Sequence, residues 1–283
     1  MIHELPLEQR TLHGYFSCEL EPALAVEPGD SLRFSVPDAG WTLASGEQFV
    51  SRDASLHTGH ALAGPIEIRG ARAGQTLVVR TDEVVPGPRG VTPTNGEALA
   101  WELGDGIGRA LGREVALAPF LGVLGMPPPE PGIHPTRPPR RWGGNIDCKE
   151  LVAGTTLYLP IPVAGALFSA GDGHAAQGDG EVCGSAIETP VTAQVTLGLR
   201  DDLSLEWPAA RLERAWLTFG FDEHLGRAAR IAVDGMLGLL EREHGLTGAE
   251  ALALASVVVD LRVTQVVNHA VGVHAVLRDD AWR

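Results

Sequence analysis

The sequence is poor in lysine and has far fewer basic than acidic residues, and this charge balance limits the partners it can have. Lys149 is the only lysine among 283 residues, and the formal net charge is −14. A chain with this charge lacks the basic face that nucleic-acid phosphates or an anionic membrane would attract. We therefore expect neither nucleic acid nor a membrane as a partner.

Cysteine is scarce as well. Cys18, Cys148 and Cys183 are widely spaced and include no Cys-x-x-Cys pair. An odd number at such spacing fits neither a disulfide framework nor a thiolate zinc cage. The N-terminus has no basic flank before an apolar run, and no apolar stretch approaches the length of a membrane-spanning helix. These features predict a cytoplasmic protein.

Several familiar catalytic signatures are missing. The sequence contains no Gly-x-Ser-x-Gly elbow, no Walker loop and no His-Glu-x-x-His helix. Cys148, Lys149 and Glu150 are the residue types of the nitrilase mechanism. Neighbours on a strand point to opposite faces, however, and cannot converge on one carbonyl. We therefore do not expect a cysteine nucleophile.

Glycine and proline are abundant and recur about every ten residues up to about residue 220, which is typical of short strands and turns. Residues 65–69 and 75–80 have strand character, and residues 71–74 read as the turn of a hairpin between them. Further strands are predicted over residues 155–163, 193–199 and 214–219. The body is therefore predicted to be rich in β structure.

Helical patterns occur only near the C-terminus. Apolar residues follow helical spacing over 225–243, and Thr247 with Glu250 forms a capping box before a second helix over 251–259. Residues 263–267 and 271–276 return to strand character. The predicted fold is mainly β with a small C-terminal α+β part, in which a β-sandwich or barrel-like body (1–220) carries the site. Residues 221–283 form an αα unit with flanking strands that completes the same globule.

A proline-rich run covers residues 126–140. Such a run cannot be helical and is too long for a tight turn. It is predicted to be an ordered connecting loop or lid, and a stiff spacer between two β parts is the alternative.

The glycine-rich segment 171–181 has the strongest chemical character. Among its glycines it carries Asp172, His174, Asp179 and Glu181, which we expect to lie within one tight turn. A histidine in such company is better suited to metal ligation or acid–base work than to core packing. A set of histidine and carboxylate ligands suits a hard or borderline cation such as Zn²⁺ or Ca²⁺.

A second polar group precedes this segment. On a strand, Asn145, Asp147 and Lys149 would share one face, with Ile146 and Cys148 on the other. This pattern predicts a strand that lines a cavity, and an edge strand with a solvated face is the alternative. The single lysine lies within this motif, which favours a role for Lys149 in the site, because a compact ammonium differs from guanidinium in reach and pKa.

Two glutamates and a histidine complete the set of candidates. Glu181 and Glu188 are seven residues apart, so both reach one pocket only if Gly184 permits a bulge or Glu188 ends a strand. Glu181 is the candidate for proton transfer, and Glu188 for anchoring. His60 precedes a Gly-Pro turn and either faces the cavity or lies on the surface. The remaining histidines considered are expected on the surface: His3, His13, His224, His244 and His269.

Three stretches resemble the acetamidase/formamidase family in the same order along the chain. They are residues 143–151, residues 171–188 and residues 260–268, and the similarity extends through residues 64–71. The resemblance implies a metal-associated hydrolase of short linear amides that releases ammonia and a carboxylate. It also implies a β-rich fold with a small helical part and a homo-oligomer.

On this interpretation the metal ligands are Asp147 and His174, with His60 and Glu188 as further candidates. Glu181 moves the proton from water to the departing nitrogen, and Lys149 and Asn145 stabilise the oxyanion. The predicted substrate-binding residues are Gln177, Asp179 and Gln265. Gln265 would be a lone amide on an apolar strand face, and it either binds substrate or satisfies a nearby backbone group.

Two other functions remain open from the sequence. One is a metal- or carbohydrate-binding β protein without catalytic activity, which kept the glycine-rich segment for structure. The other is a hydrolase of a different small C–N substrate that uses the same pocket.

Overall fold

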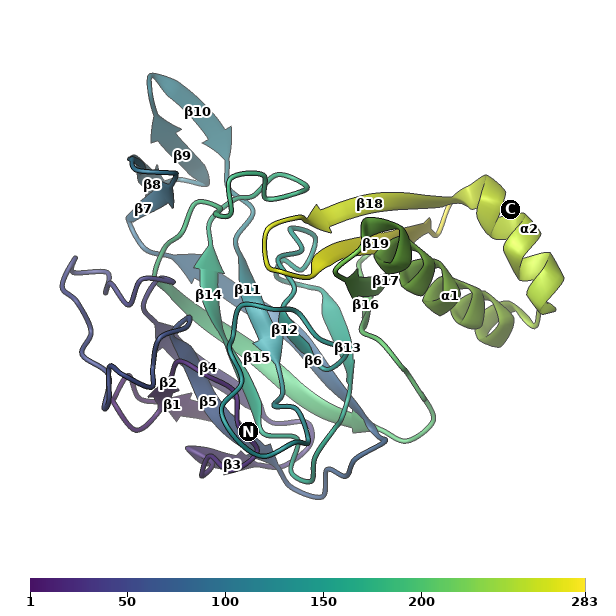
Figure 1. Ribbon diagram of the computed structural model, residues 1–283, viewed down its shortest axis with the longest axis horizontal. Coiled ribbons are helices and arrows are strands. Elements are labelled where there is room, and N and C mark those ends of the chain that lie inside the picture. Colours follow the sequence, from purple (N-terminus) through teal and green to yellow (C-terminus); the bar gives the residue numbers. More distant parts are fainter. Residues whose placement is uncertain (283) are drawn as a thin grey trace.

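The computed structural model describes residues 1–282, which form two large packed β-sheets with two helices at one end (Figure 1). This mainly β architecture with a C-terminal αα unit confirms the predicted fold class. The larger sheet has nine strands in the order β1 (Ile2–Leu5), β4 (Ser31–Val36), β15 (Val191–Arg200), β6 (Thr76–Pro86), β13 (Thr156–Pro160), β16 (Ala209–Arg211), β17 (Ala215–Asp222), β19 (Val271–Arg278) and β18 (Val259–Gln265).

The second large sheet carries most of the candidate site. Its order is β12 (Gly143–Asn145), β11 (Phe120–Gly125), β14 (Phe168–His174), β5 (Leu62–Ile68) and β2 (Leu12–His13), and β3 (Leu24–Val26) also pairs with β5. A third, four-stranded sheet projects from the body in Figure 1 and consists of β10 (Arg113–Ala116), β9 (Ile107–Ala110), β8 (Ala98–Gly104) and β7 (Arg89–Pro93).

The two large sheets share one apolar core. Along β4 and β15 buried side chains alternate with partly exposed ones, as the strand period of two requires. Phe34 and Val195 of the nine-stranded sheet belong to the same buried cluster as Ile66, Leu121 and Phe168 of the other sheet. The body is therefore a sandwich of two sheets.

The C-terminal helices cover one end of the nine-stranded sheet. Helix α1 (Leu225–His244) ends at Gly245, whose φ of 66° is the left-handed conformation common after helices, and α2 (Gly248–Val258) begins at the capping box of Thr247 and Glu250. Met236 and Leu240 of α1 pack with Ala275 of β19. Both helices and the capping box are thus confirmed. No helix among residues 1–282 has the length and apolar character to cross a membrane.

The predicted hairpin over residues 65–80 is wrong, although both of its strands exist. β5 pairs with β14, β2 and β3, whereas β6 pairs with β13 and β15 in the other sheet. The residues between the two strands therefore cross from one sheet to the other. A turn signal marks where the chain reverses, but it does not specify whether the two strands pair or face one another.

His13 is buried, not on the surface as expected. Its Nδ1 lies 2.6 Å from the carbonyl oxygen of Tyr15, and its Nε2 lies 2.9 Å from Ser169 Oγ. The carbonyl can only accept, so Nδ1 donates and Nε2 accepts from the serine hydroxyl. Burial lowers the pKa of His13 to about 4, against 6.5 for the ordinary side chain.

This histidine should make the protein sensitive to mild acid. Below the unfolded pKa the unfolded chain binds a proton that the folded chain excludes, so the contribution of His13 to stability falls as pH decreases from 6.5 toward 4. Between about pH 7 and about pH 5, wild type should lose about 2 kcal/mol more of its free energy of unfolding than His13→Gln. Urea denaturation at both pH values measures this difference. Equal losses in the two proteins would contradict it.

Candidate active site

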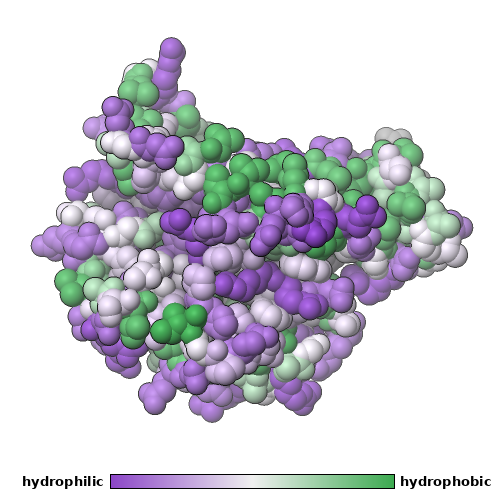
Figure 2. Space-filling view, viewed as in Figure 1, coloured by the Kyte–Doolittle hydropathy of each residue, from purple (hydrophilic) through white to green (hydrophobic). Residues whose placement is uncertain are grey.

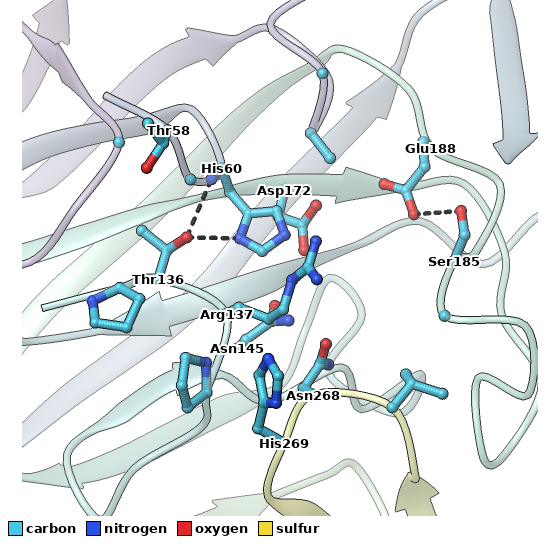
Figure 3. Close-up of a pocket in the computed structure, with 18 of the residues that line it drawn as sticks. Thr58, His60, Thr136, Arg137, Asn145, Asp172, Ser185, Glu188, Asn268 and His269 are labelled. Carbon is cyan, nitrogen blue, oxygen red and sulfur yellow. Dashed lines mark hydrogen bonds between the residues drawn. The ribbon is translucent and has the colours of Figure 1, made fainter. Parts of the chain in front are cut away.

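A polar cavity of about 860 Å³ opens where the six-stranded sheet meets the end of the β18–β19 hairpin (Figure 3). The proline-rich segment supplies one wall with Ile133, Thr136 and Arg137. This segment connects β11 to β12 without regular secondary structure, so it is an ordered loop as predicted. Figure 3 shows His60, Asp172, Asn145, Asn268, His269 and Glu188 around the same space.

Strand β14 positions the central residues. Asp172 and His174 are two residues apart on this strand, so they point to the same face of the sheet. The expectation of a tight turn is therefore wrong for residues 171–174, because they continue a paired strand. β11 runs antiparallel to β14, and its pairing sets Gly122 opposite Asp172. Asp172, which the sequence had marked as a polar residue of this segment without indicating a ligand or catalytic role, is thus a member of the candidate site.

Gly122 leaves room for carboxylates at the centre of the cluster. A Cβ atom at this position would lie 2.5 Å from Asp172 Oδ2 and 2.6 Å from Asp147 Oδ1. These distances are too short for any real side chain, so the two carboxylates occupy the space that a larger residue would fill. The sequence alone gave no reason to select this glycine.

Five ionisable side chains converge here, and all are buried. The ligand atoms of Asp147, His174 and Glu181 lie within 4.8 Å of one another, and so do those of Asp172, His174 and Glu188. His174 belongs to both groups: its Nε2 lies 3.4 Å from Asp172 Oδ2 and 3.3 Å from Glu188 Oε2.

The cluster has several buried acceptors without a hydrogen-bond partner. Within residues 1–282 these atoms are Asn145 Oδ1, Asp147 Oδ1, Asp172 Oδ1, Glu181 Oε2 and Glu188 Oε2. Buried polar groups are normally paired, and buried charges are paired or bind metals. Four carboxylates around one imidazole therefore form a donor set that fits a divalent cation.

Gln177 fixes which nitrogen of His174 carries the proton. Its Nε2 donates to the carbonyl oxygen of Asp147 at 2.7 Å, so its Oε1 faces His174 Nδ1 at 3.0 Å. An amide oxygen can only accept, which means that Nδ1 donates. In the neutral ring Nε2 then carries a free lone pair directed toward Asp172 and Glu188, as a metal ligand requires.

The pKa values in this cluster are shifted because several acidic groups lie close together in a buried space. Burial, followed by the charge of Glu181, raises the pKa of Asp147 well above its usual range. Burial also raises the pKa of Glu181 to about 7. Burial alone would lower the pKa of His174, but Glu188 and Asp172 outweigh it and raise the value well above normal. Burial and neighbouring acids therefore disfavour the ionised forms of Asp147 and Glu181, and a bound cation would favour them.

The expected strand over residues 145–149 is wrong, since β12 ends at Asn145 and Asp147 has a left-handed φ of 52°. Asn145 and Asp147 are buried at the site, but Lys149 turns away. Its Nζ forms an ion pair with Asp179 Oδ1 at 3.0 Å, and both side chains are about one-third exposed, at 31% and 32%. Neither residue is part of the cavity lining.

This position gives an expected result for Lys149. Lys149→Arg should keep turnover within about twofold of wild type, because a guanidinium can also pair with Asp179 and a partly exposed pair contributes little. Steady-state release of ammonia from a short amide, the activity that the sequence resemblance implies, measures the effect. A severe loss of turnover with unchanged stability would restore the catalytic role that the sequence suggested.

Gln265 is buried, but its side-chain amide forms hydrogen bonds with the backbone and not with the cavity. Its Nε2 donates to the carbonyl oxygen of Ala270 at 2.7 Å, and its Oε1 accepts from the backbone N–H groups of Val267 and Asn268 at 2.9 and 3.1 Å. Of the two roles that the sequence left open for Gln265, these contacts match the second, in which it satisfies nearby backbone groups. Gln265 thereby shapes the loop that carries Asn268, whose Nδ2 donates to Asp147 Oδ2 at 2.6 Å.

Glu181 and Glu188 reach the cavity from an irregular segment and not from one strand. Glu181 has a left-handed φ of 45°, and the chain around it is held to β18 because the N–H of Gly180 donates to Thr264. Glu188 Oε1 accepts from Ser185 Oγ and from the N–H of Ala186, which leaves Oε2 facing His174.

The cavity rim combines His60, which the sequence had identified as a candidate, with residues that it had not identified. His60 lines the cavity, and its Nδ1 lies 2.9 Å from Thr136 Oγ1, so the ring turns its other nitrogen toward Asp172 (Figure 3). Arg137, Asn268 and His269 also line the cavity. His269 is exposed, as expected, and it also lies at the cavity. Its place follows from the β18–β19 hairpin. Sequence periodicity predicted the two strands, but not that they pair or what their loop contacts.

Comparisons with known proteins agree on one family. The acetamidase/formamidase family model matches residues 132–212, which include all five clustered ionisable residues. An acetamidase of Mycolicibacterium smegmatis is 48% identical over 52 residues, which is 18% of this chain and 13% of that protein. A formamidase of Methylophilus methylotrophus is 45% identical over 69 residues, which is 24% of this chain and 17% of that protein. The matched stretches thus span less than a fifth of either relative.

Solved structures resemble the chain over nearly its whole length. A predicted acetamidase/formamidase of Thermoanaerobacter tengcongensis has a TM-score of 0.88 and 26% identity, and the match covers 99% of this chain and 97% of that one. An acetamidase of Bacillus halodurans has a TM-score of 0.86 and 26% identity, with coverage of 98% and 97%. A γ-lactamase of Delftia acidovorans shares the fold at a TM-score of 0.63 and 20% identity, with coverage of 99% and 93%.

Proposed function

The chain belongs to the acetamidase/formamidase family, and we propose that it hydrolyses short linear amides to ammonia and a carboxylate with a divalent metal ion, zinc or calcium. The observation that carries this proposal is the group of buried, unpartnered carboxylate oxygens around His174 Nε2. No other arrangement on this scale in residues 1–282 combines a histidine, several carboxylates and a cavity wide enough for a small amide.

The proposed ligands are Asp147, His174 and Glu188. Asp172 and His60 lie next to them and are further candidates. A cation held there would polarise the amide carbonyl and lower the pKa of the attacking water. Gln177 contributes by orienting His174, and Asn268 contributes by holding Asp147 Oδ2.

Glu181 is the proposed proton carrier. Its carboxylate is buried, and its Oε2 is unpartnered at the edge of the cluster. It takes the proton from water during attack and delivers it to the departing nitrogen. Asn145, whose Oδ1 is also free, orients the substrate amide, because a carboxamide offers one acceptor and two donors to a group of the same kind.

Ammonia release with and without metal tests this function. The purified protein should release ammonia from at least one of formamide, acetamide and propionamide, should lose that activity on treatment with a chelator, and should regain it with Zn²⁺ or Ca²⁺. Elemental analysis before and after chelation identifies the ion. Full activity in metal-free protein would refute the metal requirement, and bound metal without any amide hydrolysis would favour a binding protein.

We also propose a homo-oligomer that works in the cytoplasm. Exposed apolar side chains gather over β18 and α2, and Figure 2 shows this patch next to the polar centre of the face. Leu252, Val257 and Leu261 are half or more exposed there. Three free cysteines fit a reducing compartment. Sedimentation of wild type and Val257→Glu tests the assembly, because a buried charge would dissociate it.

A further inference from the structure

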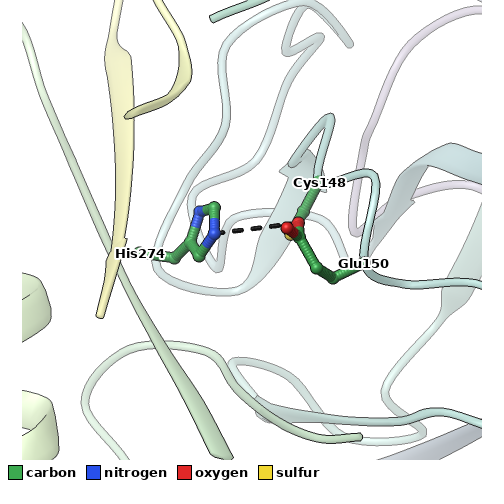
Figure 4. Close-up of side chains that lie close together, drawn as sticks. All are labelled: Cys148, Glu150 and His274. Atoms are coloured by element: carbon green, nitrogen blue, oxygen red, sulfur yellow. Dashed lines mark hydrogen bonds and ion pairs between the residues drawn. The ribbon is translucent and has the colours of Figure 1, made fainter. Parts of the chain in front are cut away.

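A second group of potential metal ligands lies apart from the cavity lining. Cys148, Glu150 and His274 offer a sulfur, a carboxylate oxygen and an imidazole nitrogen within 4.8 Å of one another (Figure 4). Cys148 and His274 are almost fully buried, with 1% and 0% of their surface exposed. None of the three residues lines the main cavity.

The β18–β19 pair positions the imidazole. His274 lies in the middle of β19, directly opposite Arg262 of β18. Its Nδ1 lies 2.8 Å from Thr264 Oγ1, which sets the ring orientation. Its Nε2 has no hydrogen-bond partner and points at Glu150 Oε2, 3.7 Å away. A buried nitrogen aimed at an acid beyond hydrogen-bond distance needs an explanation.

The carboxylate is held by its other oxygen. Arg262 Nη1 pairs with Glu150 Oε1, so Oε2 is left to face the thiol and the imidazole. Cys148 Sγ lies 3.2 Å from this Oε2. A hydrogen bond from the thiol to Oε2 gives the sulfur and the carboxylate a partner each, but it leaves His274 Nε2 without one.

The distances between the ligand atoms suit a cation with tetrahedral coordination. Zinc bonds of about 2.0 Å to nitrogen or oxygen and about 2.3 Å to sulfur imply ligand–ligand separations of roughly 3.3–3.8 Å. The separations of 3.2 Å and 3.7 Å to Glu150 Oε2 come close to this range without any rearrangement of the backbone. Cysteine with histidine also prefers a softer cation than the carboxylate-rich cavity does.

We propose that Cys148 Sγ, Glu150 Oε2 and His274 Nε2 form a second metal site, selective for zinc over calcium, with a fourth position open to water. Binding releases the thiol proton, and the thiolate and carboxylate then balance the two positive charges of the ion. The ion enters through a separate cavity of about 760 Å³, which is lined by Glu150 and Arg278.

A metal ion at this site would restrain the backbone next to the active centre. Cys148 directly follows Asp147, whose side chain joins the catalytic cluster, while Cys148 packs into the core. A cation on Cys148 therefore fixes the segment that presents Asp147. This role is structural, and it is independent of whether the main cavity hydrolyses amides.

Cobalt provides a selective test, because thiolate ligation gives an intense near-ultraviolet charge-transfer band that carboxylate and imidazole ligands do not give. Wild type reconstituted with Co²⁺ should show this band, and Zn²⁺, but not Ca²⁺, should displace it. Cys148→Ser should abolish the band and reduce bound cobalt by about one ion per chain. Cys183→Ser is the matched control, since Cys183 lines the main cavity and is itself able to reach a metal there.

Two results would overturn the proposal. One is a wild-type protein that binds cobalt without a thiolate band, and the other is a band lost in Cys183→Ser but kept in Cys148→Ser. If Cys148→Ser does not fold, X-ray absorption of zinc-loaded wild type decides the question. The proposal requires a sulfur scatterer at about 2.3 Å, and a shell of only nitrogen and oxygen refutes it.

Discussion

His174→Ala is expected to lose bound metal at the active centre and to reduce amide turnover by roughly a thousandfold or more, because it removes the ligand shared by both halves of the carboxylate cluster. Far-ultraviolet circular dichroism should stay native. The substitution removes the only nitrogen ligand of the cluster and leaves one coordination position without a protein ligand, which weakens retention of the cation. Elemental analysis and ammonia release measure the two effects.

His269→Ala is the matched control for this variant. His269 lines the same cavity but lies outside the ligand cluster, so its loss should leave metal content unchanged. Full metal content in His174→Ala would refute the ligand assignment. Equal metal loss in both variants would show that the cavity wall, and not the imidazole, controls retention.

Glu181→Gln should lower turnover by roughly a hundredfold or more while metal content is preserved. The substitution keeps the shape of the side chain but removes its ability to accept and return a proton. The expected split, with turnover lost and metal retained, separates proton transfer from ligation. Single-turnover ammonia release with metal analysis of the same sample measures it.

Asp179→Asn serves as the control for Glu181. Asp179 carries a carboxylate only two residues away, but it pairs with Lys149 outside the cavity. Its neutralisation should leave turnover close to wild type. Near-normal turnover in Glu181→Gln would transfer the proton role to another acid, and loss of metal in that variant would make Glu181 a ligand.

The sequence alone determined the features that depend on local patterns. Alternation of apolar residues predicted β13, β15 and β17, and helical spacing with a capping box predicted α1 and α2. The density of glycines and acidic residues around His174 identified the segment that carries the candidate site. Burying carboxylates is costly without a partner, so their concentration already indicated chemistry.

Only the tertiary structure decided which of these groups meet. Register across β11 and β14 set Gly122 against Asp172, and the β18–β19 hairpin brought Asn268 to Asp147 across more than a hundred residues. The left-handed backbone at Asp147 broke the expected strand face and directed Lys149 outward. Strand period fixes which side of a strand a residue occupies. Which strands become neighbours depends on the packing of the whole core, and no local pattern contains that information.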